Sequence, residues 1–445
     1  MKAFQKLLPL VLICFLLVAC GSTPAPTAPE TAEAPTEPVP EILDWADDEQ
    51  PSADTLKQAV TVKSFIDGDT THFFVPGEVN PEGVLKARFL AVNTPESTGK
   101  IEEYGKAASN YTKEKLMAAE SIIIESDTDS WNADSTGGRY LVWVWYKTAD
   151  MEDYRNLNIE ILQNGLAIAS NSGGNIYGDI ALAAIAQAKA QKLNVHSGKK
   201  DPDFYYGEAV ELDLKELRTN VEDYNGMKVA FTGIVTVNSN SSVYVETYDS
   251  ETDMYYGMSV YYGYGLSGDG LQILNVGNEV RIVGTVQYYE TGKTWQVSGL
   301  TYRAMKPNDP SNIQKLSEGH APAYVLTDPA RFVSGTVDVV VDETVTTLPY
   351  AQLAMSTSLR MENLYVKEVY TTNDEESSSY GAMTLTCEVN GVIVSVRTVV
   401  LLDANGNLIT EDAYLGKTID VRGIVDYFDG GYQIKVFSPN DITIH

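Results

Sequence analysis

The chain has 445 residues, a formal net charge of −29 and hydrophobic residues at 44% of its positions. A chain of this length exceeds one compact core and predicts about three domains. Its negative balance argues against non-specific nucleic-acid affinity, which rests on Lys and Arg, but suits a surface protein or one that meets nucleic acid through a cation-filled site.

Residues 1–20 have the layout of a secretory signal. Lys2 and Lys6 precede the short apolar run "LLPLVLICFLLVA", which stops at "LVACGS". The four residues "LVAC", Leu17 to Cys20, resemble the lipobox of bacterial lipoproteins, in which the cysteine is lipidated and becomes the first residue of the mature protein. The alternative is an ordinary secretory signal or a single membrane anchor, for which the run is short. We therefore expect lipidation of Cys20, a membrane-held protein on the extracytoplasmic side, and a mature charge of −31 (−29 − 2).

The cysteines leave no pair for an internal disulfide. Cys14 falls in the signal and Cys20 would carry lipid, so only Cys387 remains. The alternating stretch "MTLTCEVNGV" predicts that Cys387 is a core residue of a strand. Residues 21–55 are rich in Pro, Ala, Thr and Glu, which predicts a disordered, semi-extended tether.

Residues 56–200 predict strands, a helix, strands and two helices, in that order. This order is typical of an α+β domain that combines a barrel with helices. The expected strands are 59–66, 84–92, 121–126 and 139–146, and the expected helices are 102–120, 156–167 and 179–195.

The remainder of the chain, from about residue 209, is rich in Tyr, Val and Thr with frequent turns, which predicts all-β structure. A weak internal repeat aligns "NVGNEVRIVGTVQYY" (275–289) with "YLGKTIDVRGIVDYF" (414–428). A long strand broken by glycine and followed by a hairpin resembles OB-fold barrels. We expect OB-like domains at 209–305 and 346–445, joined by a linker at 306–345.

The Tyr-rich stretch 243–265 has two interpretations. Aromatic side chains on an OB sheet stack on single-strand bases, but Tyr is also an ordinary strand residue. Few Lys or Arg flank this stretch.

Five short motifs in the first domain carry the polar and charged residues of interest. Asp-Gly-Asp alone is a common turn, and an arginine beside a hairpin can be a plain surface charge. Arg88 is more informative, because a charge amid apolar strand residues needs a partner. The motifs are "IDGDT" with Asp67 and Asp69, "RFLAVNTPE" with Arg88, Asn93, Thr94 and Glu96, "EYGKAAS", "GGRYLVWV" with Arg139, and "LNIEILQNGLA".

In this order, the motifs resemble the staphylococcal nuclease (thermonuclease) family over residues 58–198. The resemblance implies an SNase-type OB barrel with helices for this part. Together with the OB-like pattern of the later residues, we expect an α+β then all-β chain, in which two OB-like β-barrel domains follow the first. It also implies a hydrolase, an endonuclease that cleaves DNA or RNA with Ca²⁺. The protein is expected to be a monomer.

The resemblance also implies a role for each motif residue. Asp69 and the Thr94 carbonyl would be Ca²⁺ ligands, and Asn93 stands where the family has a second aspartate ligand. Asp67 would lie next to these ligands without binding the metal itself. Arg88 and Arg139 would hold the phosphate, and Glu96 would be the general base.

The chemistry of a phosphodiester agrees with these residue types. The substrate is an anion, so its hydrolysis requires cations, which a hard metal ion and two guanidiniums supply. A carboxylate must also take a proton from the attacking water. The four histidines are scattered, so we expect no zinc site. The departure at Asn93 removes one negative charge, which leaves open a catalytically weakened nuclease fold that acts as a binding or adhesion lipoprotein.

Overall fold

The computed structural model describes residues 42–445 except 48–49, 137, 240, 264, 291, 342–343, 375–376, 378 and 429. The predicted signal, Cys20 and most of the predicted tether lie outside the described residues. In the part that is described, no helix is long and apolar enough to cross a membrane.

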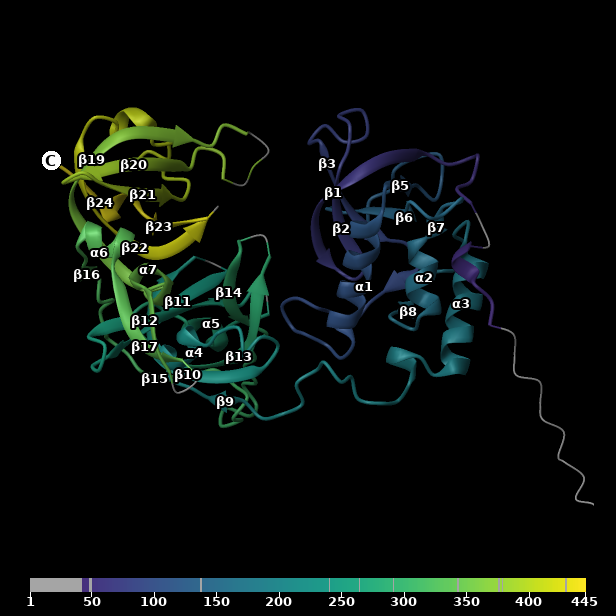
Figure 1. Ribbon diagram of the computed structural model, residues 1–445, viewed down its shortest axis with the longest axis horizontal. Coiled ribbons are helices and arrows are strands. Elements are labelled where there is room, and N and C mark those ends of the chain that lie inside the picture. The colour runs from purple at the N-terminus through teal and green to yellow at the C-terminus, as the bar shows by residue number, and fades with distance from the viewer. Residues whose placement is uncertain are drawn as a thin grey trace, which may run out of the picture. The chain divides into compact units, whose positions relative to one another are not determined.

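The first folded domain is a closed five-stranded barrel with packed helices (Figure 1). Antiparallel pairs join β2 to β3, β2 to β1, β1 to β5 and β5 to β6, and a parallel pair of β3 with β6 closes the barrel. The strands are β1 (Lys57–Asp67), β2 (Thr70–Phe74), β3 (Val84–Phe89), β5 (Ser121–Glu125) and β6 (Tyr140–Lys147).

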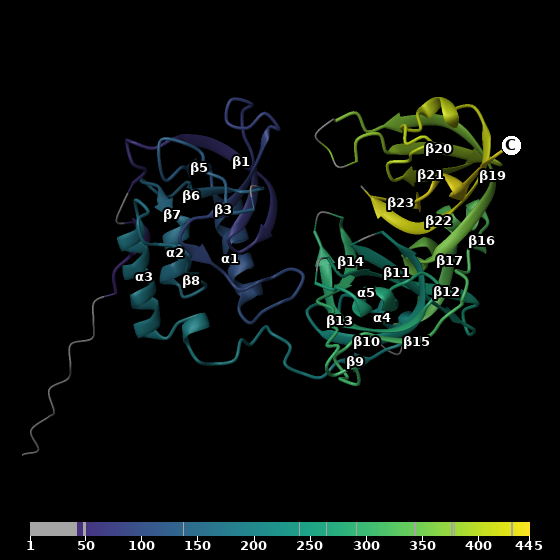
Figure 2. The same cartoon turned by 180° about the vertical axis from the view of Figure 1, so that it is seen from behind.

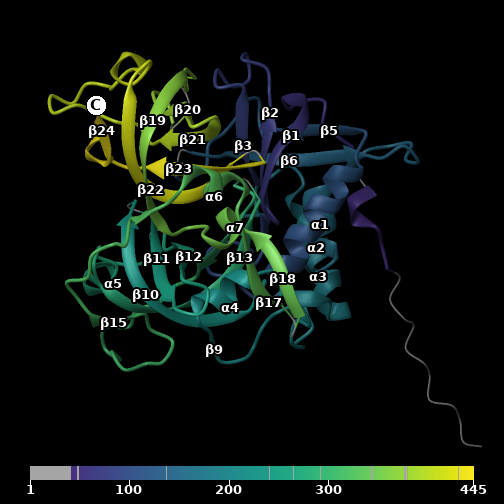
Figure 3. The same cartoon turned by 60° about the vertical axis from the view of Figure 1, so that its left-hand side comes forward.

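Helices α1 (Gly105–Ala118), α2 (Leu157–Gln163) and α3 (Gly178–Gln191) gather on one side of this barrel (Figures 1 and 3). The burial of the strands differs around the barrel. β3 alternates buried residues with residues that point outward, whereas every residue of β6 from Val142 to Tyr146 is buried. The short elements of this domain are η1 (Trp45–Asp47), β4 (Val92–Asn93), β7 (Arg155–Asn156), β8 (Ile168–Ala169) and η2 (Asn194–His196).

The second domain is also a closed barrel, formed by β10, β11, β12, β14 and β13 in that order (Figure 2). Its elements are β9 (Val210–Glu211), α4 (Leu214–Thr219), β10 (Lys228–Asn238), β11 (Ser242–Asp249), β12 (Met254–Tyr261), α5 (Asp269–Ile273), β13 (Glu279–Tyr289), β14 (Thr294–Ser298) and β15 (Gln314–Ser317).

The third domain repeats this topology, with β19, β20, β21, β23 and β22 closing the barrel (Figure 2). Its elements are β16 (Val325–Leu326), α6 (Pro329–Ser334), β17 (Thr336–Val341), β18 (Thr344–Pro349), α7 (Tyr350–Leu353), β19 (Ser358–Thr371), β20 (Met383–Val389), β21 (Val392–Thr398), η3 (Glu411–Ala413), β22 (Thr418–Phe428), β23 (Gly431–Val436), η4 (Pro439–Asp441) and β24 (Ile442–Ile444). Three closed five-stranded barrels within the described residues confirm the expected fold class.

The sequence repeat corresponds to equivalent strands, β13 and β22. Its paired glycines mark positions where a side chain has no room. A Cβ on Gly284 would lie 2.6 Å from the Ser298 carbonyl oxygen, and one on Gly423 would lie 2.4 Å from that of Lys435. Glycine at these positions lets the hairpin strand approach closely.

The segment 306–345 differs from the expected linker. It contains β15, which pairs with β13 of the second barrel, and β16, which pairs with β19 of the third. It also contains α6 and β17. These elements are too short to give a periodic pattern of their own, so their strand pairing comes from the neighbouring barrels.

Cys387 lies buried in β20 as a free thiol. Burial raises the pKa of this thiol to about 12, so it is a weak nucleophile. It is a core residue, as its strand pattern predicts.

Candidate functional site

The site is built around a tight turn between β1 and β2. β1 ends at Asp67 and β2 begins at Thr70, so Gly68 and Asp69 form the turn. A Cβ on Gly68 would lie 2.8 Å from Thr94 Cγ2 and 2.9 Å from Ala108 Cβ. Glycine is therefore required where the turn, the loop after β4 and helix α1 converge.

The strand register brings Arg88 to this turn. β2 and β3 pair Thr70 directly with Arg88, next to Asp69. The Arg88 guanidinium forms an ion pair with the Asp69 carboxylate and donates a second hydrogen bond of 2.7 Å to Asn93 Oδ1. Arg88 therefore bridges the two side chains that sequence reasoning assigns to a metal ion.

Asp69 is almost fully buried, with 1% of its surface exposed. Its carboxylate accepts hydrogen bonds from the Thr94 backbone N–H (2.9 Å) and from Thr70 Oγ1 (3.0 Å). Burial raises the pKa of Asp69, although the charge of Arg88 opposes this effect. Thr94 Oγ1 is buried beside this group and has no hydrogen-bond partner among the described residues.

Glu96 and Asp67 form the second half of the site. Loss of hydration, a hydrogen bond with Asp67 and the negative charges of Asp67 and Asp69 raise the pKa of Glu96 to about 7. Asp67 in turn accepts a hydrogen bond of 2.7 Å from Ser97 Oγ. The Glu96 side chain reaches the surface, where it would meet substrate and water.

The start of helix α1 holds the Glu96 backbone in place. The Glu102 N–H donates to the Glu96 carbonyl at 2.9 Å. A Cβ on Gly105 would lie 2.1 Å from that same carbonyl oxygen. The "YG" of the third motif therefore serves close packing, because only glycine allows the helix to begin against this loop.

The side chains around this turn offer mainly oxygen atoms as donors. Asp67, Asp69 and Glu96 place three carboxylates beside one guanidinium. Burial is the main cause that raises the pKa of Asp69 and of Glu96, and the positive charge of Arg88 opposes this effect at both carboxylates. Oxygen ligands of this kind are those that Ca²⁺ prefers. Across the described ranges, no group of three or more His, Cys, Asp or Glu side chains is arranged to hold a metal ion. The predicted ligands include only one such side chain, Asp69, which Arg88 contacts.

Arg139 lies apart from these contacts. Its Nε donates to Asp134 Oδ2 at 2.8 Å, and a terminal nitrogen lies 2.7 Å from the same oxygen. The register pairs Arg88 with Leu141 of β6, whereas Arg139 precedes the first residue of that strand. The Arg139 guanidinium is held by Asp134 in the turn before β6.

Sequence reasoning missed two of these partners. Asp134 orients Arg139, and its carboxylate also accepts hydrogen bonds from the Thr136 N–H (3.1 Å) and hydroxyl (2.6 Å). The signal was an Asp-x-Thr turn before the "GGR" motif. Ser97, the partner of Asp67, carried no signal beyond its place after Glu96.

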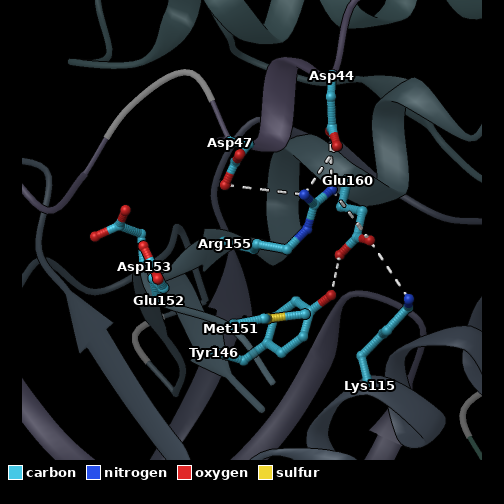
Figure 4. A pocket seen from close by; sticks show the side chains of 9 residues that line it. All are labelled: Asp44, Asp47, Lys115, Tyr146, Met151, Glu152, Asp153, Arg155 and Glu160. Carbon is cyan, nitrogen blue, oxygen red and sulfur yellow. Dashed lines mark hydrogen bonds and ion pairs between the residues drawn. The ribbon is translucent and has the colours of Figure 1, made fainter. Parts of the chain in front are cut away.

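A separate open pocket of about 560 Å³ lies in the same domain (Figure 4). Several of its charged side chains are paired: Arg155 contacts Asp44 at 2.8 Å, and Glu160 accepts a 2.7 Å hydrogen bond from Tyr146. Lys115 lies 3.5 Å from Glu160. None of the predicted site residues lines this pocket. Its network ties the segment before β1 to helix α2.

The first domain thus combines a closed five-stranded barrel, helices on one side and an arginine–carboxylate cluster at the turn between its first two strands. The family model described as "Staphylococcal nuclease homologue" matches residues 86–197. Over 148 residues the chain is 29% identical to the protein "Thermonuclease" of Staphylococcus intermedius, which covers 32% of this chain and 79% of that protein. The chain therefore contains a staphylococcal nuclease-like domain, followed by two OB-like barrels.

Proposed function

We propose that this protein is a Ca²⁺-dependent nuclease that hydrolyses phosphodiester bonds of DNA or RNA and is held at the cell surface by lipid on Cys20. The observation that supports it best is the bridge in which Arg88 contacts both Asp69 and Asn93, with Glu96 alongside. The bridge gathers a phosphate-binding guanidinium and cation-binding oxygens at one turn.

In this proposal Asp69, Asn93 and the Thr94 carbonyl hold the cation. When bound, the Ca²⁺ supplies positive charge beside the scissile phosphate and favours the ionised form of a nearby water. Arg88 would bind the phosphate. Its planar guanidinium can donate two hydrogen bonds to the oxygens of an anion, just as it contacts Asp69 and Asn93 in this structure. Arg139 would bind a second phosphate oxygen after exchanging Asp134 for substrate.

Glu96 would accept the proton of the attacking water. Its pKa near 7 makes it a better base than an ordinary glutamate while leaving much of it ionised at neutral pH. Its neighbour Asp67, fixed by Ser97, keeps the pKa high and orients the carboxylate.

Digestion of plasmid DNA and of RNA by the full chain, in millimolar Ca²⁺ and in excess EDTA, tests the proposal. We expect cleavage that EDTA abolishes and that added Ca²⁺ restores. Cleavage that is equally fast in EDTA, or no cleavage of either polymer in Ca²⁺, would reject it.

One observation favours the second candidate function, a nuclease fold that binds without turnover. Asn93 is neutral where the family has a ligand aspartate, and it is already engaged by Arg88. That candidate predicts that Asn93→Asp creates a cleavage activity that the parent chain lacks. Cleavage by the parent chain rejects it.

A further inference from the structure

Two cations stand side by side on the outer face of the third barrel. Arg397 of β21 and Lys435 of β23 are direct partners in a parallel strand pair. Both side chains are half-buried and alternate with buried neighbours, so both point away from the barrel core. The backbones of neighbouring strands lie about 4.8 Å apart, and the charge of Arg397 acts against that of Lys435.

These cations have little acidic compensation among the described residues. Arg397 donates to two hydroxyls, Thr384 Oγ1 and Thr372 Oγ1, both at 3.0 Å. Lys435 Nζ lies 3.9 Å from Asp426, and that carboxylate already accepts a 2.9 Å hydrogen bond from Gln433. The Tyr244 hydroxyl also lies within hydrogen-bonding reach of Lys435. Among the described residues, the nearby carboxylate is thus that of Asp426 beside Lys435, in a chain whose net charge is −29.

The second barrel shows that the fold does not need these cations. Val260 pairs with Val297 in that barrel as Val396 pairs with Ile434 in the third. One residue further along each strand, the equivalents of Arg397 and Lys435 are Tyr261 and Ser298. Ser298 Oγ donates a 2.6 Å hydrogen bond to Gln287, which is equivalent to Asp426. A neutral arrangement therefore closes the same barrel.

An exposed aromatic side chain continues the row. Tyr370 of β19 pairs with Thr384 of β20, and Thr384 pairs with Arg397. The Tyr370 side chain is 62% exposed. The row Tyr370, Thr384, Arg397 and Lys435 thus crosses four strands and offers, in order, a ring, a hydroxyl and two cations. Figure 2 shows β20, β21 and β23 of this barrel.

We propose that this row binds single-stranded nucleic acid, with Arg397 and Lys435 on its phosphates and Tyr370 stacked on a base. The phosphates remove the repulsion between the two cations, and ring stacking suits bases that are not paired. The choice of nucleic acid as the ligand rests on the proposed function. The site would hold substrate strands for a chain too acidic to attract them otherwise.

Binding of a fluorescein-labelled oligothymidylate to the full chain, followed by anisotropy in EDTA at several salt concentrations, tests the site. The variants R397Y and K435S install the residues of the second barrel. We expect each to weaken binding and to reduce the salt slope by about 0.7, the value for one phosphate contact on a single strand. Tyr370→Ala should weaken binding about tenfold with an unchanged slope, because stacking carries no charge.

Lys367→Ser is the matched control, since it removes a cation of β19 that already pairs with Glu388 at 2.6 Å. It should leave the slope unchanged. Arg397→Lys keeps the charge and should keep the slope, even if R397Y were to unfold. Unchanged slopes in R397Y and K435S, or no binding by the parent, would overturn the site. Equal affinity for an abasic deoxyribose-phosphate oligomer would overturn nucleic acid as the ligand. The assay needs no cleavage, so the site and the proposed catalysis can fail separately.

Discussion

At the scale of single residues, Arg88 joins the groups on which the proposed chemistry depends. Its guanidinium contacts Asp69 and donates to Asn93, so the two side chains that are predicted to bind Ca²⁺ are already paired with a positively charged group of the protein itself. A cation that binds these oxygens must compete with Arg88. Asn93 lowers the affinity of this position for Ca²⁺, because an amide oxygen attracts Ca²⁺ less than a carboxylate does.

Asn93→Asp should therefore increase the affinity for Ca²⁺. The added negative charge lies beside Asp69, and we expect a gain of about tenfold, equivalent to about 1.4 kcal/mol. Isothermal titration of the full chain with CaCl₂ measures it. Asp129→Asn, in an exposed loop of the same domain, serves as the control for net charge. A weaker or equal affinity in Asn93→Asp would contradict the assignment of residue 93 as a ligand.

Glu96 sets the expected pH dependence. The carboxylate must be ionised to accept a proton, and its pKa is about 7 without a cation. Activity should therefore rise as the pH increases through the neutral range. Bound Ca²⁺ favours the ionised form, so the midpoint should move to lower pH as the Ca²⁺ concentration increases. Initial cleavage rates between about pH 5 and 9 at two Ca²⁺ concentrations measure it; a midpoint independent of Ca²⁺ would separate Glu96 from the metal.

At the scale of elements, the repeated hairpins depend on glycine. Gly423→Ala would place a Cβ 2.4 Å from the Lys435 carbonyl oxygen and 2.8 Å from Ile434 Cγ2. The strands must separate, which should cost about 1–3 kcal/mol of unfolding free energy. Urea denaturation measures it. Gly431→Ala in the same hairpin should have little effect, because its nearest neighbour would lie 3.9 Å away. Equal stability of the two variants would contradict the packing argument.

Elements with a strong local pattern were predictable. β6 is an apolar run ended by turns, and α1 and α3 are long enough to show a helical period. Two-residue strands such as β7 and β8, and the strands inside 306–345, have no pattern of their own. They form because a neighbouring strand offers unpaired backbone groups, which is a property of the assembled barrel.

At the scale of the whole molecule, the site could be predicted only in part. The first two of the five ordered motifs contain Asp69, Arg88, Asn93, Thr94 and Glu96, and the structure brings these residues together. The motifs could not show that Arg88 contacts Asn93, or that Asp134 holds Arg139, because both contacts depend on how loops fold onto strands. They also gave no sign of the Arg397–Lys435 pair, which depends on a strand register.

The proposed membrane anchor leads to a prediction for the whole chain. If Cys20 carries lipid, the protein made in a bacterial host should partition into the detergent phase of a Triton X-114 extract. Cys20→Ser should move the cleaved chain to the aqueous phase. Cys387→Ser is the matched control, since that thiol is buried in β20. Partitioning of both variants into detergent would contradict lipidation at Cys20.

The most direct test of the account compares initial rates of cleavage by the parent chain and by Glu96→Gln in millimolar Ca²⁺. Glu152→Gln, an exposed acid of the same domain, controls for lost charge. We predict that Glu96→Gln loses at least about 100-fold in rate, as expected for a lost general base, while Glu152→Gln keeps the parent rate. A Glu96→Gln chain that cleaves as fast as the parent would contradict the proposed nuclease site.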